Sequence, residues 1–154
     1  MNEVERIGDP RLRSLTLRAN AAEEGVLAAK LYCKITHLET VAANLTVQSL
    51  KHREEAENIT ARGQYFYNKM KEQQEQLDQQ KGPKDILAAE VIRNREKAMS
   101  LSAQATSHEK KMGKMEERAR SALAESVRLR RERDRHLLDA KKLDAEAVRT
   151  ETLI

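Results

Sequence analysis

The chain has 154 residues, of which 35% are charged and only 3% aromatic, with no tryptophan and one phenylalanine. Such a composition excludes an ordinary globular core, which needs more large apolar side chains. With only five glycines and two prolines, it also argues against disorder. The 29 basic and 25 acidic residues are mostly interleaved, so the net charge of +4 does not by itself predict nucleic-acid binding. The single cysteine excludes an internal disulfide.

The first predicted element is a helix over about residues 10–80. Asp9 can cap its free amides and Pro10 fits its first turn, and no proline follows before Gly82-Pro83. Glycine suits the left-handed residue that ends a helix, and proline cannot continue one. The sequence therefore predicts a turn at about 81–85 and a second helix over about 86–152, within a single coiled-coil unit.

Both predicted helices carry a heptad pattern of apolar residues at alternating steps of three and four. The pattern runs from Ala28 to Leu77 in the first helix and from Leu87 to Ile154 in the second. When the chain is folded at Gly82, large residues face small ones, as in the pairs Phe66 with Ala98, Gly63 with Leu101, and Ile59 with Ala105. The predicted fold is therefore all-α, a long antiparallel two-helix coiled-coil hairpin.

One alternative topology stays open. The heptad frame passes through the break without a phase shift, along Leu77, Gln80, Lys84 and Leu87. One continuous helix in a parallel coiled coil would show the same frame, although an interior proline costs about 3 kcal/mol or more.

The heptad positions of the two helices that face each other form a seam. A second apolar stripe follows the first helix on the face away from this seam. A two-helix coiled coil should be charged on that face, so the stripe predicts docking against a helix of a protein partner or of a second copy. The second helix adds Val127, Leu138 and Val148 at its own outer positions. The stripe consists of Leu12, Leu15, Ala19, Ala22, Val26, Ala29, Cys33, Thr36, Thr40, Ala43, Val47 and Leu50.

The densest basic run lies between Arg128 and Arg135. Arg128, Arg130, Arg131 and Arg135 could contact an acidic protein or nucleic acid. Acidic residues interrupt the run and no aromatic side chains accompany it, so a solvated, salt-bridged face is favoured over nucleic-acid binding.

No residue pattern predicts chemistry. His52 and His108 fall one core layer apart. A metal site would need further ligands, which are not apparent in the sequence. A buried polar layer is also much commoner in coiled coils than a metal site. No Walker loop, dinucleotide fingerprint or HExxH motif occurs. We therefore expect no enzyme activity, no cofactor, no metal and no small-molecule substrate.

The expected function is that of a scaffolding subunit that docks through the stripe into a larger protein assembly. A basic, charge-rich hairpin of about this length resembles the stalk proteins of flagellar and type III secretion export machinery, which implies an accessory role beside an export ATPase. The likeness covers the whole chain and concerns length and helix layout rather than a motif; cytoskeletal and axonemal coiled-coil proteins are equally similar. No signal segment or apolar span is seen, which predicts a soluble protein of the cytoplasm or another intracellular compartment.

Overall fold

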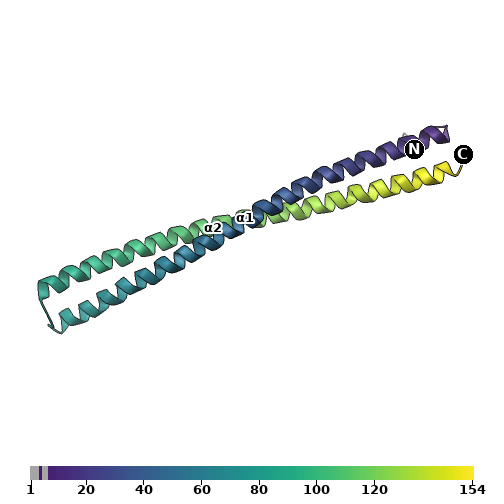
Figure 1. Cartoon of the computed structure of the whole chain (residues 1–154). Helices are drawn as coiled ribbons and strands as arrows, with labels where there is room; N and C mark the ends of the chain where they lie inside the picture. Colours follow the sequence, from purple (N-terminus) through teal and green to yellow (C-terminus); the bar gives the residue numbers. More distant parts are fainter. Residues whose placement is uncertain (1–3, 5–6) are drawn as a thin grey trace. The chain divides into compact units, whose positions relative to one another are not determined.

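The computed structural model describes Val4 and residues 7–154 of the chain. These residues form two α-helices, α1 (Pro10–Asp78) and α2 (Lys84–Glu151), which pack against each other as a two-helix hairpin (Figure 1). The predicted all-α hairpin is confirmed. The alternative of one continuous helix is wrong, because α1 ends at Asp78, before the glycine and the proline.

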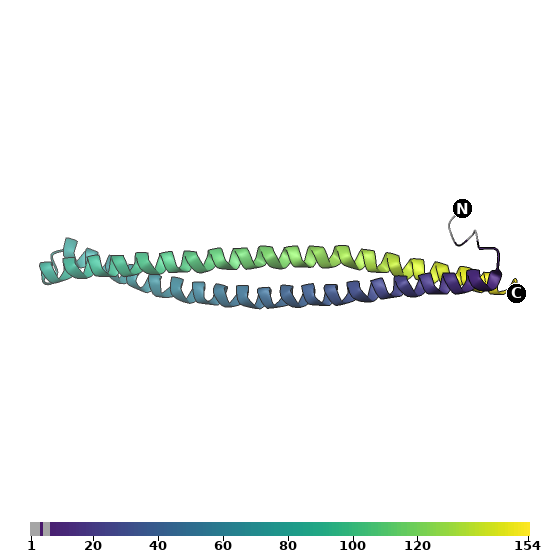
Figure 2. The ribbon, with the colours of Figure 1, turned by 90° about the horizontal axis from the view of Figure 1, so that it is seen from above.

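Contacts between the helices divide the chain into two compact units. The terminal unit comprises Met1–Ala42 with Arg120–Ile154, and the turn unit comprises Ala43–Ala119. In each unit a segment of α1 lies beside a segment of α2, as both ribbon views show (Figures 1 and 2). Within the described residues, neither helix has a stretch apolar enough to cross a membrane.

The start of α1 is fixed by local hydrogen bonds. The Asp9 carboxylate accepts a bond of 3.0 Å from the backbone N–H of Arg11, which is the bond expected of an N-cap residue. The guanidinium of Arg13 then donates two bonds, of 3.1 and 2.8 Å, to the carbonyl of Ile7. These bonds hold the segment before the helix against its first turn.

The left-handed residue that ends α1 is not the predicted glycine. Gln80, with φ of 54°, takes the left-handed conformation that follows the helix, while Gly82, with φ of 97°, lies two residues later in the turn. The Gln80 N–H donates to the carbonyl of Leu77 (3.1 Å) and the Lys81 N–H to that of Gln76 (2.8 Å). This pair of bonds is a Schellman motif, which satisfies two carbonyls that the helix end would otherwise leave free. The expected role of Gly82 as the residue that ends the helix is therefore wrong.

The terminal unit is closed by apolar side chains at heptad positions. Leu17 (1% exposed) packs in a cluster with Ala147 and Leu143. Ile35 (1% exposed) packs with Leu31 and Leu129. The seam begins at Ser14, which is buried, and therefore extends further toward the start of α1 than the expected beginning at Ala28.

In the turn unit the two helices approach each other closely at one glycine and share a buried polar layer nearer the turn. A Cβ atom added to Gly63 would lie 3.5 Å from the Cβ of Leu101, so the predicted pairing of these two residues is confirmed. Nearer the turn, the buried Asn94 donates a hydrogen bond of 2.7 Å to Gln73. Buried polar pairs of this kind favour one register, because a slip would leave their groups unsatisfied.

Ion pairs between the helices flank the seam in both units. In the terminal unit Arg18 pairs with Glu151 (2.8 Å) and Arg130 with Glu39. In the turn unit Arg53 pairs with Glu116 (3.3 Å). All of these side chains are exposed by 38% or more, so solvent screens the pairs and each contributes little to stability.

The most connected of these carboxylates is Glu151, at the last residue of α2. Arg18 donates two hydrogen bonds to it (2.8 and 2.9 Å), and Ser14 donates a third (2.7 Å). These bonds, that of Arg18 first, lower the pKa of Glu151 from its ordinary value of 4.5 to about 2. A carboxyl group with a lowered pKa stabilises the folded state above its unfolded pKa, and this contribution is lost as the pH falls through the folded value.

We therefore expect Glu151→Gln to lower the midpoint of thermal unfolding at neutral pH, with the difference from the wild type shrinking below about pH 4.5 and vanishing near pH 2. Thermal melts of the wild type and the variant, followed by circular dichroism across this pH range, would measure the difference. Glu117→Gln, at an exposed carboxylate of the same helix, is the control. A difference that stayed constant down to pH 2 would contradict the assignment to this carboxylate.

Candidate functional site: the outer stripe of α1

Every member of the outer stripe of α1 is exposed. Nine members, from Leu12 to Thr40, lie in the terminal unit, and Ala43, Val47 and Leu50 lie in the turn unit. The exposed fraction reaches 65% for Leu15 and is 54% for Leu12 and for Val26. Within each unit, therefore, the stripe takes no part in closing the seam, and a partner could cover it without unfolding the pair of helices.

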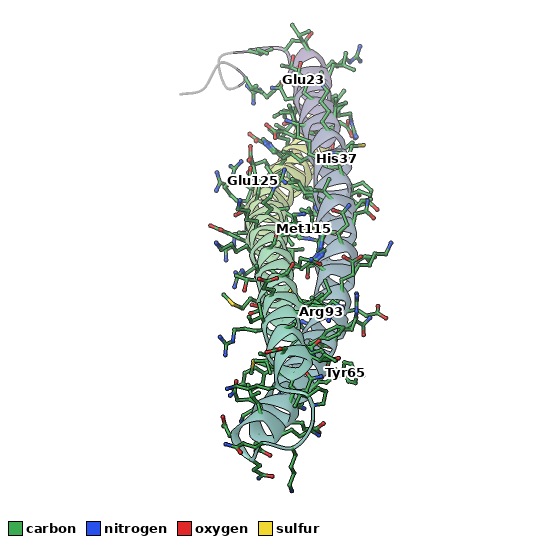
Figure 3. All side chains as sticks on the ribbon, turned by 90° about the vertical axis from the view of Figure 1, so that its left-hand side faces the viewer. Glu23, His37, Tyr65, Arg93, Met115 and Glu125 are labelled. Carbon is green, nitrogen blue, oxygen red and sulfur yellow. The ribbon has the colours of Figure 1, made fainter. Side chains whose placement is uncertain are left out.

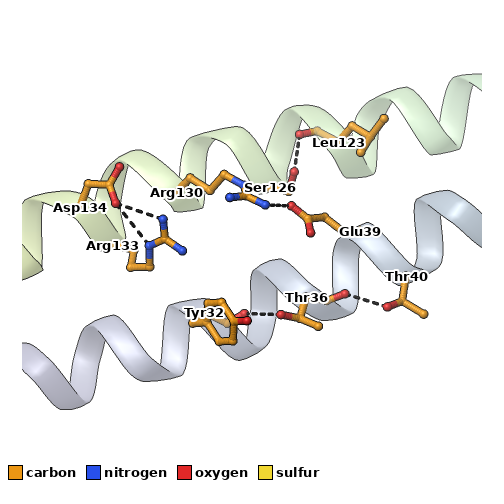
Figure 4. A network of polar contacts seen from close by, with 9 residues as sticks. All are labelled: Tyr32, Thr36, Glu39, Thr40, Leu123, Ser126, Arg130, Arg133 and Asp134. Atoms are coloured by element: carbon orange, nitrogen blue, oxygen red, sulfur yellow. Dashed lines mark hydrogen bonds and ion pairs between the residues drawn. The ribbon is translucent and has the colours of Figure 1, made fainter.

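The threonines of the stripe are already hydrogen-bonded within α1. The Thr36 hydroxyl donates to the carbonyl of Tyr32 (3.0 Å) and the Thr40 hydroxyl to the carbonyl of Thr36 (2.9 Å) (Figure 4). Threonine commonly makes such bonds to the preceding turn of a helix. An apolar partner could cover these residues without leaving a hydroxyl donor unsatisfied.

Small residues leave a shallow hollow in the surface of the stripe. Ala19 and Ala22 are followed by Val26 and form a shallow hollow on α1, with Leu27 and charged side chains at its margin. In helix packing a side chain of one helix fits between four residues of the other, and alanines provide room for it. The hollow in the stripe could therefore accept a side chain from another helix.

Further exposed apolar side chains lie in the terminal unit. Val127, Leu138 and Val148 on α2 are exposed by 48%, 51% and 51%, as their outer heptad positions indicate. Sequence reasoning missed Tyr32, which is 58% exposed, and three exposed leucines. Their position next to stripe residues of α1, or next to outer residues of α2, was the available signal. The missed leucines are Leu27, Leu123 and Leu137.

Side chains that carry nitrogen and oxygen atoms project outward along both helices (Figure 3). In the arginine run, Arg128 binds Glu125 (2.5 Å) and Glu132 (3.5 Å), and Arg133 binds Asp134 (3.1 Å). The bond from Arg128 lowers the pKa of Glu125.

Across the seam, Arg130 binds Glu39 (Figure 4). Within the described residues no ion pair is found for the exposed Arg131 and Arg135. Much of the positive charge of this run is thus neutralised locally, which leaves Arg131 and Arg135 as its free cations.

Two histidines meet across the seam of the turn unit. The Nδ1 atoms of His52 and His108 lie 2.9 Å apart, and the Nδ1 atom of His108 lies 3.2 Å from a carboxylate oxygen of Glu55. Sequence reasoning placed the two histidines close together but missed Glu55. The three-residue spacing between His52 and Glu55, which puts both on one face of a helix, was the signal for it.

Comparisons with protein-family models, with curated proteins and with solved structures find no match to this chain. The function must therefore be inferred from the surface of the hairpin itself. The stripe is an apolar surface that the packing of α1 on α2 leaves exposed in each unit.

Proposed function

We propose that this chain is a scaffolding subunit without catalytic activity, which packs the outer stripe of α1 against a helix of a protein partner in a larger assembly. The observation that supports this most is the exposure of Leu12, Leu15 and Val26 in a unit whose seam is already closed by Leu17 and Ile35. Apolar residues repeated along the face of a helix that needs none for folding are typical of a docking surface.

The magnitudes favour the stripe over the charged surface. Full burial of a leucine or valine side chain stabilises a complex by about 1.5–3 kcal/mol, and each of the large stripe residues is about half exposed, so roughly half of that is available per side chain. An exposed ion pair contributes about 0–1 kcal/mol. Several leucines and valines along one face therefore outweigh the few free arginines.

Site-specific photo-crosslinking would test this proposal. A photo-reactive amino acid placed at Leu15 or at Val26 should crosslink to a discrete protein partner in the cells that produce the chain. The same group at Lys34, exposed on α1 beside the stripe rather than on it, should give little or no crosslinked product. Equal crosslinking from all three positions, or none from the stripe, would reject the stripe as a docking surface.

A second candidate function is electrostatic recognition of an acidic protein or nucleic acid, which Arg131 and Arg135 support because both are exposed and unpaired among the described residues. Binding through phosphate contacts weakens steeply as salt concentration rises, whereas binding through the stripe should not. A third measurement, stimulation of an export ATPase by the purified chain, would distinguish a stalk-like role from scaffolding and from electrostatic recognition.

A further inference from the structure

His52, Glu55 and His108 form a cluster in the turn unit. His52 and Glu55 come from one face of α1, one helical turn apart, and His108 comes from α2 on the other side of the seam. One ligand atom from each of the three side chains lies within 4.8 Å of the other two. Side chains from two helices therefore direct three potential electron-pair donors to one point.

Hydrogen bonding alone satisfies this cluster poorly. A neutral imidazole carries one N–H and one lone pair, and a carboxylate carries only acceptors. If the Nδ1 atom of His108 holds a proton, that single proton must serve both the Nδ1 atom of His52, at 2.9 Å, and the Glu55 oxygen, at 3.2 Å. One divalent cation would satisfy all three lone pairs at once.

The distances suit such a cation. Zinc binds histidine nitrogen and carboxylate oxygen at about 2.0–2.2 Å in tetrahedral geometry, which places neighbouring ligand atoms about 3.3 Å apart. The separations of the His108 Nδ1 atom from its two neighbours, 2.9 and 3.2 Å, reach this value after shifts of a few tenths of an ångström, and all three ligand atoms lie within 4.8 Å of one another. We propose that His52, Glu55 and His108 form a binding site for a divalent transition-metal ion, with Zn²⁺ the expected ion because two imidazoles and one carboxylate are a ligand set that zinc uses.

The surroundings allow entry and a fourth ligand. The His108 side chain is 23% exposed and that of Glu55 is 57% exposed, so an ion could reach the site from solvent. The exposed Glu55 also leaves the site open to water, the usual fourth ligand where a protein supplies three. A bound ion would connect α1 to α2 within the turn unit.

Titration of the full-length chain, prepared without a polyhistidine tag, would test the site. Isothermal calorimetry at neutral pH should show one Zn²⁺ bound per chain, and Co²⁺ should give the intense visible absorption of a tetrahedral complex. His108→Ala should reduce affinity by more than the roughly 10–100-fold that loss of an outer-shell partner causes. His37→Ala, at an exposed histidine elsewhere on α1, should leave affinity unchanged.

Glu55→Gln tests the site without disturbing the seam, since the side chain is mainly exposed. We expect it to weaken Zn²⁺ binding at least about tenfold, with Glu54→Gln, at the adjacent exposed carboxylate, as the matched control. Circular dichroism without metal should show unchanged helix content for both variants. Absence of stoichiometric binding to the wild type, or binding that survives both His108→Ala and Glu55→Gln, would overturn the proposal.

Discussion

Replacing Leu15 and Val47 by glutamate should abolish the association of this chain with its partner while leaving the helix content unchanged. The two side chains are 65% and 52% exposed and lie away from the seam in their respective units, so the hairpin does not need them. In a complex, each substitution would replace buried apolar surface by a desolvated carboxylate, which costs several kcal/mol unless it is paired. Co-purification from the producing cells and sedimentation velocity would measure association, and circular dichroism would measure helix content.

The matched control for this prediction reverses charge without touching the stripe. Arg131→Glu with Arg135→Glu alters two exposed residues that have no ion pair among the described residues, so it leaves the contacts between the helices intact. We expect it to weaken association much less. If the Leu15/Val47 variant assembled normally and the arginine variant did not, docking through the stripe would be wrong and electrostatic recognition would become the leading account.

The turn supports a second large effect. Replacing Gly82 and Pro83 by alanine should convert the hairpin into a longer, domain-swapped dimer. Alanine at Gly82 would have to adopt a φ of 97°, and its Cβ would approach Leu87 to 3.3 Å. The left-handed conformation costs a non-glycine residue about 1–2 kcal/mol, and removal of Pro83 relieves about 3 kcal/mol against a continuous helix. Sedimentation velocity should show an elongated dimer.

Gln80→Gly is the opposing variant. Gln80 already holds a positive φ of 54°, and glycine adopts that conformation without a steric cost. We expect this change to stabilise the hairpin by about 1 kcal/mol and to leave the oligomeric state of the chain unchanged. A Gly82/Pro83 variant that stayed a monomeric hairpin would show that packing along the seam, rather than the turn, determines the topology.

Heptad spacing predicts which face of each helix is buried, because the position of a residue in the repeat fixes its direction from the helix axis. The contact between Gly63 and Leu101 and the exposure of Leu15 followed from this geometry. By contrast, Gln80 became the left-handed residue through backbone hydrogen bonds at the helix end, where glutamine gives no sequence signal. Glu55 was missed because the apolar repeat marks only the positions in the seam and Glu55 lies beside them; its three-residue spacing from His52 was the remaining signal.

At the other end of α1, the seam extends beyond the regular apolar pattern. Ser14 is buried there at a position where the repeat calls for an apolar residue. Its hydroxyl donates to Glu151, so a hydrogen bond replaces an apolar contact. A search for apolar spacing could not find this layer, because the interaction that closes it is polar.

Small side chains occupy many of the buried positions in the seam, and this has a calorimetric consequence. Alanine recurs among the buried residues of both helices, whereas Leu17 and Ile35 are the largest fully buried side chains among the described residues. Unfolding therefore exposes little apolar surface per residue, and exposed apolar surface is the source of the positive heat-capacity change, about 12–15 cal/mol/K per residue in globular proteins. With a smaller value here, the free energy of unfolding should follow a less curved dependence on temperature than that of a globular protein of the same length.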